Sequence, residues 1–140
     1  MKIKHILWII LSAFSLTLAS CSNDDKINQD YESQIIGSWW NTKDYDSNED
    51  EWYYWSDDKN YLETYVFEFK SNGTGYMKEP NDDYDYGFIY TISGKNVHLD
   101  FNDDDYYYED TMDIQIDFPK DDELIMDYGD GYYMYFSRIK

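Results

Sequence analysis

Residue types that carry catalysis, metal binding or covalent cross-links are scarce in this sequence. Its 140 residues include one cysteine and two histidines, which excludes an internal disulfide and a metal site built from several thiolates. Lys and Arg number 11 against 30 Asp and Glu, and the formal net charge is −19. Because a phosphate backbone is bound by basic surface, we expect no nucleic-acid partner.

Long apolar runs are also scarce, and the clearest one lies near the N-terminus. Residues 6–19 are mostly apolar and follow Lys2 and Lys4. A basic start followed by such a stretch is typical of a secretion signal. The stretch is shorter than the roughly 20 residues that a membrane-spanning helix needs, so we expect it to be cleaved.

The apolar stretch ends in Leu18-Ala19-Ser20-Cys21, which resembles the lipobox of bacterial lipoproteins. The resemblance implies that residues 1–20 are a signal peptide and that Cys21, the sole cysteine, is acylated and anchors the chain to the outer membrane. Ser22-Asn23-Asp24-Asp25 is similar to the export signal of surface lipoproteins in Bacteroidota-type bacteria, which implies display on the cell surface. The alternative is an ordinary signal peptide with a chance cysteine at its cut site.

Aromatic residues are abundant and indicate a folded domain. The chain has 17 Tyr, 7 Phe and 5 Trp, whereas disordered acidic chains are poor in large apolar side chains. We expect a lipidated cysteine and polar tether over residues 21–34, which ends in a short helical turn at residues 31–35. Residues 35–140 then form one domain.

Period-two alternation runs through this domain and predicts β-strands. In residues 112–118, Met, Ile and Phe alternate with Asp and Gln, as in a strand with one buried and one solvated face. Turns rich in Gly, Asn and Asp separate such segments. The expected strands are residues 36–44, 61–70, 74–79, 86–93, 96–102, 107–118, 123–128 and 132–139. Residues 51–56 are either a further strand or a packed loop.

Eight short strands joined mostly by tight turns favour an all-β, antiparallel up-and-down barrel, because closure removes exposed edges. A two-sheet β-sandwich is the alternative fold, since alternation does not show whether the first and last strands meet.

Several segments resemble the lipocalin-like lipoproteins of Bacteroidota-type bacteria. Ile35-Ile36-Gly37-Ser38-Trp39 looks like the Gly-x-Trp opening of a lipocalin barrel, and residues 65–73 look like the second strand and its turn. Residues 90–97, 124–126 and 135–138 are similar to later strands. The resemblance implies an eight-stranded barrel in which Trp39 covers the closed end and Arg138 stacks on its ring.

Two aromatic clusters supply the candidate ligand contacts. Trp40, Trp52 and Tyr54 lie near the first predicted loop, and Tyr106 and Tyr108 belong to a second aromatic run. Alternation turns only part of each run inward, and rings left outside or at a barrel mouth can stack on sugar rings or hold an apolar molecule. The alternative is a Tyr-rich core with its hydroxyls at the rim.

Motifs for metal binding and catalysis are weak. Asp44-x-Asp46-x-Asn48 and Asp100-x-Asn102-x-Asp104 begin like calcium loops but lack the Gly and Glu of the full EF-hand pattern, and we interpret both as solvated loops. His98 is expected to project outward beside Asp100, with no nucleophile motif in the chain. We therefore expect no enzymatic activity, no metal and no cofactor.

Together these features favour an outer-membrane-anchored, non-enzymatic lipocalin-like lipoprotein that is held to the membrane through Cys21. Its expected ligand is a small apolar or glycan-derived molecule, bound at the open end of the barrel. The competing hypothesis is an acidic protein-interaction module, of inhibitor or immunity type, that engages a basic protein partner.

Overall fold

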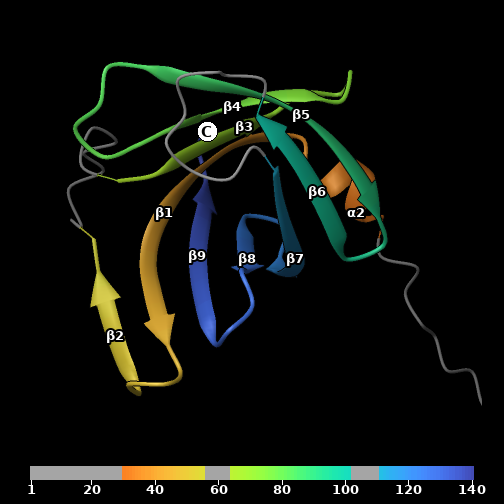
Figure 1. Ribbon diagram of the computed structural model, residues 1–140. Helices are drawn as coiled ribbons and strands as arrows, with labels where there is room; N and C mark the ends of the chain where they lie inside the picture. Colours follow the sequence, from red (N-terminus) through yellow and green to blue (C-terminus); the bar gives the residue numbers. More distant parts are fainter. Residues whose placement is uncertain (1–29, 56–63, 102–110) are drawn as a thin grey trace, which may run out of the picture.

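A computed structural model describes residues 30–55, 64–101 and 111–140 of the chain. These residues form a short helix and nine antiparallel strands (Figure 1). The elements are α2 Tyr31–Gln34, β1 Gly37–Asp46, β2 Glu51–Tyr54, β3 Val66–Phe69, β4 Thr74–Lys78, β5 Asp85–Ser93, β6 Asn96–Phe101, β7 Thr111–Lys120, β8 Glu123–Asp127 and β9 Tyr132–Arg138. Within this described part, none of the helical structure is long and apolar enough to cross a membrane.

The sheet closes on itself because its first and last strands pair. Each strand from β3 to β9 is hydrogen-bonded to the next, and β1 pairs with β3. Strand β1 also pairs with β9, from Trp39↔Arg138 to Asp46↔Tyr132. Eight strands therefore form the predicted antiparallel up-and-down barrel, and the two-sheet sandwich is excluded. Closure satisfies the edges that an open sheet would expose.

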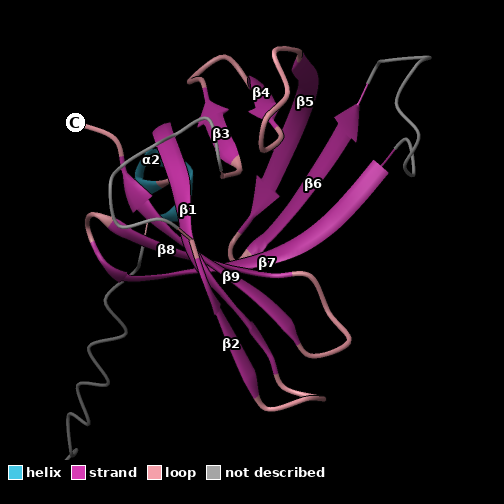
Figure 2. Cartoon of the chain, turned by 90° about the vertical axis from the view of Figure 1, so that its left-hand side faces the viewer, coloured by secondary structure: helices cyan, strands magenta, loops and turns pink. Residues whose placement is uncertain are grey.

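Strand β2 settles the open question about residues 51–56. It pairs with the C-terminal half of β1, from Lys43↔Tyr54 to Asp46↔Glu51, whereas β3 pairs with the N-terminal half. Strand β9 pairs with the other edge of β1 along both halves. On the first edge, β2 therefore takes the place beside β1 that β3 occupies in the barrel. We call β2, the C-terminal half of β1 and the paired half of β9 the extension, which projects beyond β3 (Figure 2); β8 pairs with β9 along its other edge.

Most predicted strand ends that fall in the described residues agree with the structure to within two residues, the predicted start at 107 lies outside them, and two boundaries have a physical explanation. The segment predicted as strand 61–70 is a strand only over Val66–Phe69 in its described part, because the Thr64 hydroxyl instead bonds the carbonyl of Asn41 at 2.7 Å. Strand β7 runs past Pro119 to Lys120. A register shift between Asp117 and Lys120 accommodates the proline, which has no N–H to donate to the ladder.

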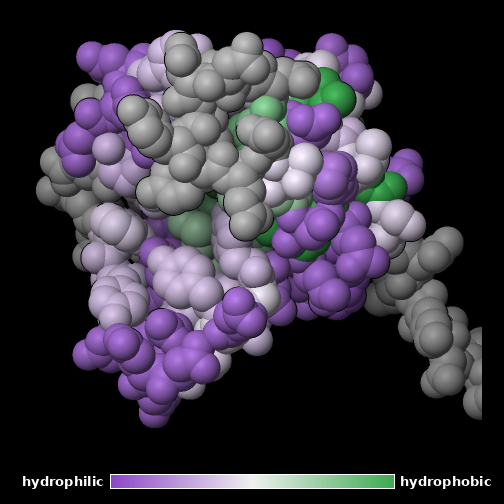
Figure 3. Space-filling view, viewed as in Figure 1, coloured by the Kyte–Doolittle hydropathy of each residue, from purple (hydrophilic) through white to green (hydrophobic). Residues whose placement is uncertain are grey.

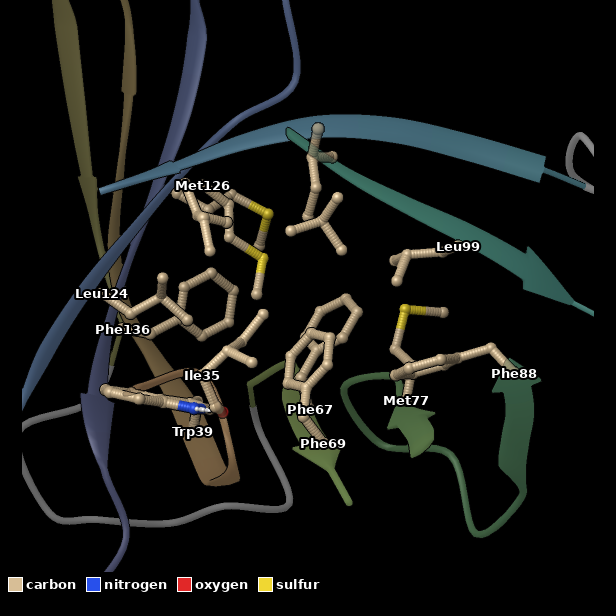
Figure 4. Close-up of a cluster of buried hydrophobic side chains, with 14 of the residues drawn as sticks. Ile35, Trp39, Phe67, Phe69, Met77, Phe88, Leu99, Leu124, Met126 and Phe136 are labelled. Atoms are coloured by element: carbon tan, nitrogen blue, oxygen red, sulfur yellow. Dashed lines mark hydrogen bonds between the residues drawn. The ribbon is translucent and has the colours of Figure 1, made fainter. Parts of the chain in front are cut away.

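The barrel interior is filled by the apolar side chains that alternation placed on one face. In β7, the inward residues of 114–118 are buried, as the pattern predicts. Figure 4 shows side chains from opposite walls meeting around Phe67 and Phe69. The ring centroid of Phe67 lies 5.7–6.2 Å from those of Phe69, Phe88 and Phe136. Each buried side chain of this size contributes about 1.5–3 kcal/mol to folding.

One end of the barrel is covered by α2 and by the two residues that the family resemblance pairs. The Arg138 guanidinium lies 4.1 Å from the ring centroid of Trp39. It also donates hydrogen bonds of 2.7 Å to the carbonyls of Gln34 and Ile36, the first of which is among the groups that a helix end leaves unpaired. Trp39 Nε1 donates to the carbonyl of Ile35 at 2.8 Å. The contact is therefore structural: it ties the last strand to the helix and the first strand.

Gly75 of β4 is required by packing. A Cβ at this position would collide with the backbone carbonyl of Glu68 and with the ring of Phe88. On the neighbouring strand, Gly87 lies opposite Tyr76, and a Cβ there would meet nothing within 4 Å. The two adjacent glycines therefore differ in the space around them, one being in a filled part of the wall and the other in an open part.

Candidate functional site

The extension carries aromatic side chains on the outer side of all three of its strands. Because Met134 and Phe136 of β9 point into the core, Tyr133 and Tyr135 point outward. Cross-strand pairing aligns outward residues of β1 and β2 with these two tyrosines. We call this set the aromatic face. Its members are Lys43 and Tyr45 of β1, Trp52 and Tyr54 of β2, and Tyr133 and Tyr135 of β9.

Ring contacts make the aromatic face continuous. The ring centroid of Trp52 lies 4.7 Å from that of Tyr45, 5.2 Å from that of Tyr135 and 6.3 Å from that of Tyr54. Tyr45 lies 6.3 Å from Tyr133. Trp52 is nevertheless 41% exposed and Tyr54 73% exposed. A clustered, exposed aromatic surface on an otherwise charged protein marks an interaction site.

Lys43 lies in the middle of the aromatic face. Its Nζ is 4.4 Å from the ring centroid of Trp52 and 4.9 Å from that of Tyr135, within the range of cation–π attraction. The side chain is half-buried, which is typical of a lysine stem that covers apolar surface while its charge stays near water. No ion pair among the described residues includes Lys43.

Two hollows continue the aromatic face across the barrel wall. One, of about 210 Å³, lies beside Lys43 and Tyr135 and reaches Glu123 and Ser137. The other, of about 280 Å³, begins at Tyr133 and Tyr135. Its polar lining consists of Lys95, Gln115, Asp117 and Asp127. Aromatic surface is thus bordered by groups that donate and accept hydrogen bonds.

Two tyrosines of the aromatic face, Tyr45 and Tyr135, have a raised pKa. Burial raises the pKa of Tyr135, with a smaller contribution from Tyr133. The Tyr45 hydroxyl donates to Asp50 at 2.9 Å, and this hydrogen bond raises the pKa of Tyr45. Both hydroxyls therefore remain protonated near neutral pH and can serve as donor or acceptor.

A buried carboxylate holds the inner side of the extension together. Asp44 is 1% exposed and accepts hydrogen bonds from Asn41 Nδ2 at 2.7 Å, Trp55 Nε1 at 3.0 Å and the Tyr132 hydroxyl at 2.9 Å. Trp55 follows β2 and Tyr132 begins β9, so Asp44 ties both neighbours of β1 to it. Burial and then the bond to Asp44 raise the pKa of Tyr132.

The interpretation of the Asp44-x-Asp46-x-Asn48 motif as a solvated loop is therefore wrong for its first member. The Asp44 carboxylate is enclosed and its oxygens are occupied by protein donors. Asp46 instead accepts from the backbone N–H of Asn48 at 2.8 Å, as in an Asx-turn. In the second motif, Asn102 and Asp104 lie outside the described residues.

The structure brings together two of the five predicted ligand-contacting aromatics, Trp52 and Tyr54. Trp40 is half-buried and lies three residues before Lys43, where it pairs with Ser137 of β9. Tyr106 and Tyr108 lie outside the described residues.

Sequence reasoning missed four members of the aromatic face. Lys43 and Tyr45 alternate with inward residues along β1, and Tyr133 and Tyr135 do the same along β9. This alternation is the available signal. It does not reveal that the two pairs are cross-strand neighbours, because that follows from the register of β1 with β9.

A further hollow, of about 590 Å³, is lined in part by His98. His98 Nδ1 lies 2.7 Å from Asp113 Oδ1, its cross-strand neighbour on β7, so its partner is Asp113 rather than Asp100. The Asp113 side chain is 86% exposed, unlike the buried carboxylate that orients the imidazole of a catalytic triad. Nowhere in the described ranges do three or more His, Cys, Asp or Glu side chains come together as a metal site.

Comparison with known proteins supports the fold. No family model matches the sequence, and no curated protein matches it. The barrel is similar to the crystal structure of a lipocalin-like protein from Bacteroides uniformis, with a TM-score of 0.58 and 12% sequence identity over 76% of this chain and 99% of that chain. At this identity the likeness concerns the fold alone, which is a lipocalin-like β-barrel.

Proposed function

We propose that this protein is a lipid-anchored, non-enzymatic binding protein of the bacterial outer membrane whose aromatic face binds a glycan-derived ligand. A lipocalin-like barrel suggests a ligand-binding role. The observation that carries the proposal is the exposed, continuous layer of rings around Trp52. No comparison names a ligand, so the ligand class rests on the chemistry of this surface.

The aromatic face suits a sugar better than a purely apolar molecule. The apolar C–H surface of a sugar ring packs on the negative face of an aromatic ring. Its hydroxyls need hydrogen-bonding partners beside that ring, and the hollow that begins at Tyr133 and Tyr135 is bordered by Gln115, Asp117 and Asp127. An apolar ligand would make no hydrogen bonds with those polar groups.

The outer surface is better supported as the binding site than the barrel mouth expected from the sequence. The described part of the interior is occupied by packed side chains, with Phe67 in contact with three other rings (Figure 4). Tight aromatic packing of this kind leaves little room between opposite walls.

The anchor belongs to the same proposal. Cys21 lies outside the described residues, and its acylation rests on the lipobox-like segment that ends there. The mature N-terminus should be an acylated Cys21 by mass spectrometry, and Cys21→Ser should move the protein from the membrane fraction to the soluble fraction. An unmodified N-terminus at another residue would contradict the anchor.

Binding of neutral and acidic oligosaccharides to the full chain in detergent tests the proposed ligand class. Tyr54→Ala removes the most exposed ring of the aromatic face and should weaken binding about 2–12-fold, as expected for an aromatic contact of about 0.5–1.5 kcal/mol. Tyr84→Ala is the matched control, because Tyr84 is also exposed, at 54%, and lies outside the aromatic face. Failure of every oligosaccharide to bind, or equal loss in both variants, would refute the proposal.

A protein-interaction role is the second candidate, and the tip of the extension favours it. The β1–β2 hairpin carries Glu49, Asp50 and Glu51, and Asn48 Nδ2 bonds the carbonyl of Asp130 beside it. Figure 3 shows hydrophilic side chains gathered at this tip. Association of a basic protein with such a surface should weaken steeply between low and physiological salt, whereas sugar binding by stacking should change little.

A further inference from the structure

Among the described residues, Lys43 differs from the other lysines near this surface in having no acidic partner. Lys95 pairs with Asp117 at 3.1 Å, and Lys120 pairs with Glu123 at 2.6 Å. In the described part of the chain, the side-chain contacts of Lys43 are instead with aromatic rings. An ammonium that makes no ion pair within the described ranges of so acidic a chain, of formal net charge −19, is available to an anion from outside.

Among the described acids on the same outer side, Glu123 borders the hollow beside Lys43 but is paired with Lys120 at 2.6 Å, and Asp117 lies farther away. The register places Ile125 beside Tyr135 and Asp117 beside Ile125, so Asp117 is three strands away from Lys43. At about 4.8 Å per strand, that separation is roughly 14 Å. Charges this far apart in solvent are largely screened at physiological ionic strength, where the Debye length is about 8 Å. The Asp117 carboxylate therefore does not cancel the field next to Lys43.

We propose that the glycan ligand carries a carboxylate, as a uronic acid does, and that Lys43 is the residue that selects it. The ammonium lies over the rings of both Trp52 and Tyr135, at 4.4 and 4.9 Å from their centroids. A sugar ring stacked on Trp52 would bring an equatorial carboxylate within reach of Nζ. This inference rests on the proposed function, because it specifies the ligand of the aromatic face.

The layout of the surface also predicts how the glycan lies. Tyr54, Lys43, Tyr135, Ile125 and Asp117 form one cross-strand row over β2, β1, β9, β8 and β7. The row begins with aromatic surface and ends in the polar hollow, and its length is about 19 Å at 4.8 Å per strand. A linear oligosaccharide crossing the strands fits this row, with its carboxylate at Lys43 and its hydroxyls over the polar end.

The experiment compares matched neutral and acidic oligosaccharides on the full chain in detergent. The probes are β-1,4-linked mannotetraose and the tetramer of β-1,4-linked mannuronic acid, together with neutral and uronic-acid pairs of other linkages. Titration calorimetry should show that at least one acidic member binds about tenfold or more tightly than its neutral counterpart, as expected for a charge-assisted hydrogen bond. Lys43→Met, which keeps an apolar stem, should abolish that preference, and Lys43→Arg should retain it.

Lys70→Gln is the matched control, because Lys70 also lies over a tyrosine ring, 5.6 Å from the Tyr76 centroid, but is not part of the aromatic face. It should leave the preference unchanged, and urea unfolding should show all variants folded. Equal binding of neutral and acidic members, or a preference that survives Lys43→Met, would overturn the inference while the proposed function stands. Failure of every oligosaccharide to bind would overturn the proposed function and this inference with it.

Discussion

Removal of the Asp44 carboxylate should destabilise the protein more than removal of any surface acid. Asp44→Ala leaves Asn41 Nδ2, Trp55 Nε1 and the Tyr132 hydroxyl without their acceptor. A hydrogen bond to a charged group contributes about 1.5–3 kcal/mol, but three bonds on one group are not additive. The buried charge that disappears also relieves a desolvation cost. We therefore expect a loss of about 3–5 kcal/mol in the free energy of unfolding.

Asp44→Asn should cost less, about 1–2 kcal/mol, because its amide keeps one oxygen to accept from Trp55 or Tyr132 while Asn41 can turn its own amide. Urea unfolding followed by tryptophan fluorescence measures both variants. At roughly 4 °C per kcal/mol, Asp44→Ala should lower Tm by about 12–20 °C. The control is Asp117→Ala, which breaks a half-exposed ion pair with Lys95 and should cost no more than about 1 kcal/mol.

The ordering of these three variants tests the argument. If Asp44→Ala unfolds within about 0.5 kcal/mol of Asp117→Ala, the carboxylate does not hold the three strands of the extension together. If Asp44→Asn is as unstable as Asp44→Ala, then the charge, rather than the acceptor oxygen, is what the site requires.

Two further predictions concern the barrel wall and alkaline pH. Gly75→Ala should destabilise by about 1–3 kcal/mol in urea, since its methyl meets the filled wall, whereas Gly87→Ala should be neutral or stabilise by up to about 1 kcal/mol; equal effects would contradict the packing. The pKa of Tyr132 is raised in the folded state, so the folded state holds the hydroxyl proton more tightly than the unfolded state does. The stabilisation that this provides is present below about pH 10 and is lost as pH rises beyond it. The free energy of unfolding should therefore fall between about pH 9 and 12, and Tyr132→Phe, although less stable at pH 7, should show a shallower fall; an unchanged slope would exclude Tyr132 as the cause.

The barrel could be predicted from the sequence because inward positions are strongly apolar. In β7, Ile114, Ile116 and Phe118 alternate with polar residues, and a one-residue slip would move all of them to solvent. The contact between Trp39 and Arg138 at the covered end of the barrel was expected from the family resemblance, and the structure places these side chains in contact. The one distant neighbour pair that these inferences needed, the first strand beside the last, came from the resemblance and from the expected closure of the barrel.

The aromatic face could not be predicted in full because tyrosine is compatible with both sides of a strand. In β9, Tyr132 contacts the buried Asp44, whereas Tyr133 and Tyr135 face outward. Because the side chain is the same in each case, composition does not separate the tyrosine that contacts Asp44 from those on the aromatic face. The burial of Asp44 was missed for a related reason: two of its three donors, Trp55 and Tyr132, come from other segments that strand pairing brings to β1.

The two sides of β1 should affect ligand binding in distinguishable ways. Lys43 is on the aromatic face, whereas Asp44, the next residue, points inward and fixes the strands on which that face is built. Lys43→Met should therefore weaken acidic oligosaccharides and spare neutral ones, because it removes one contact. Asp44→Asn, assayed well below its urea midpoint, should weaken both to a similar extent, because it loosens the placement of the rings of Trp52 and Tyr135. Calorimetry on the two variants with the same matched pair of sugars would distinguish loss of a ligand contact from misplacement of the rings. If Asp44→Asn weakened the acidic sugar alone, Asp44 would not act through the position of the rings.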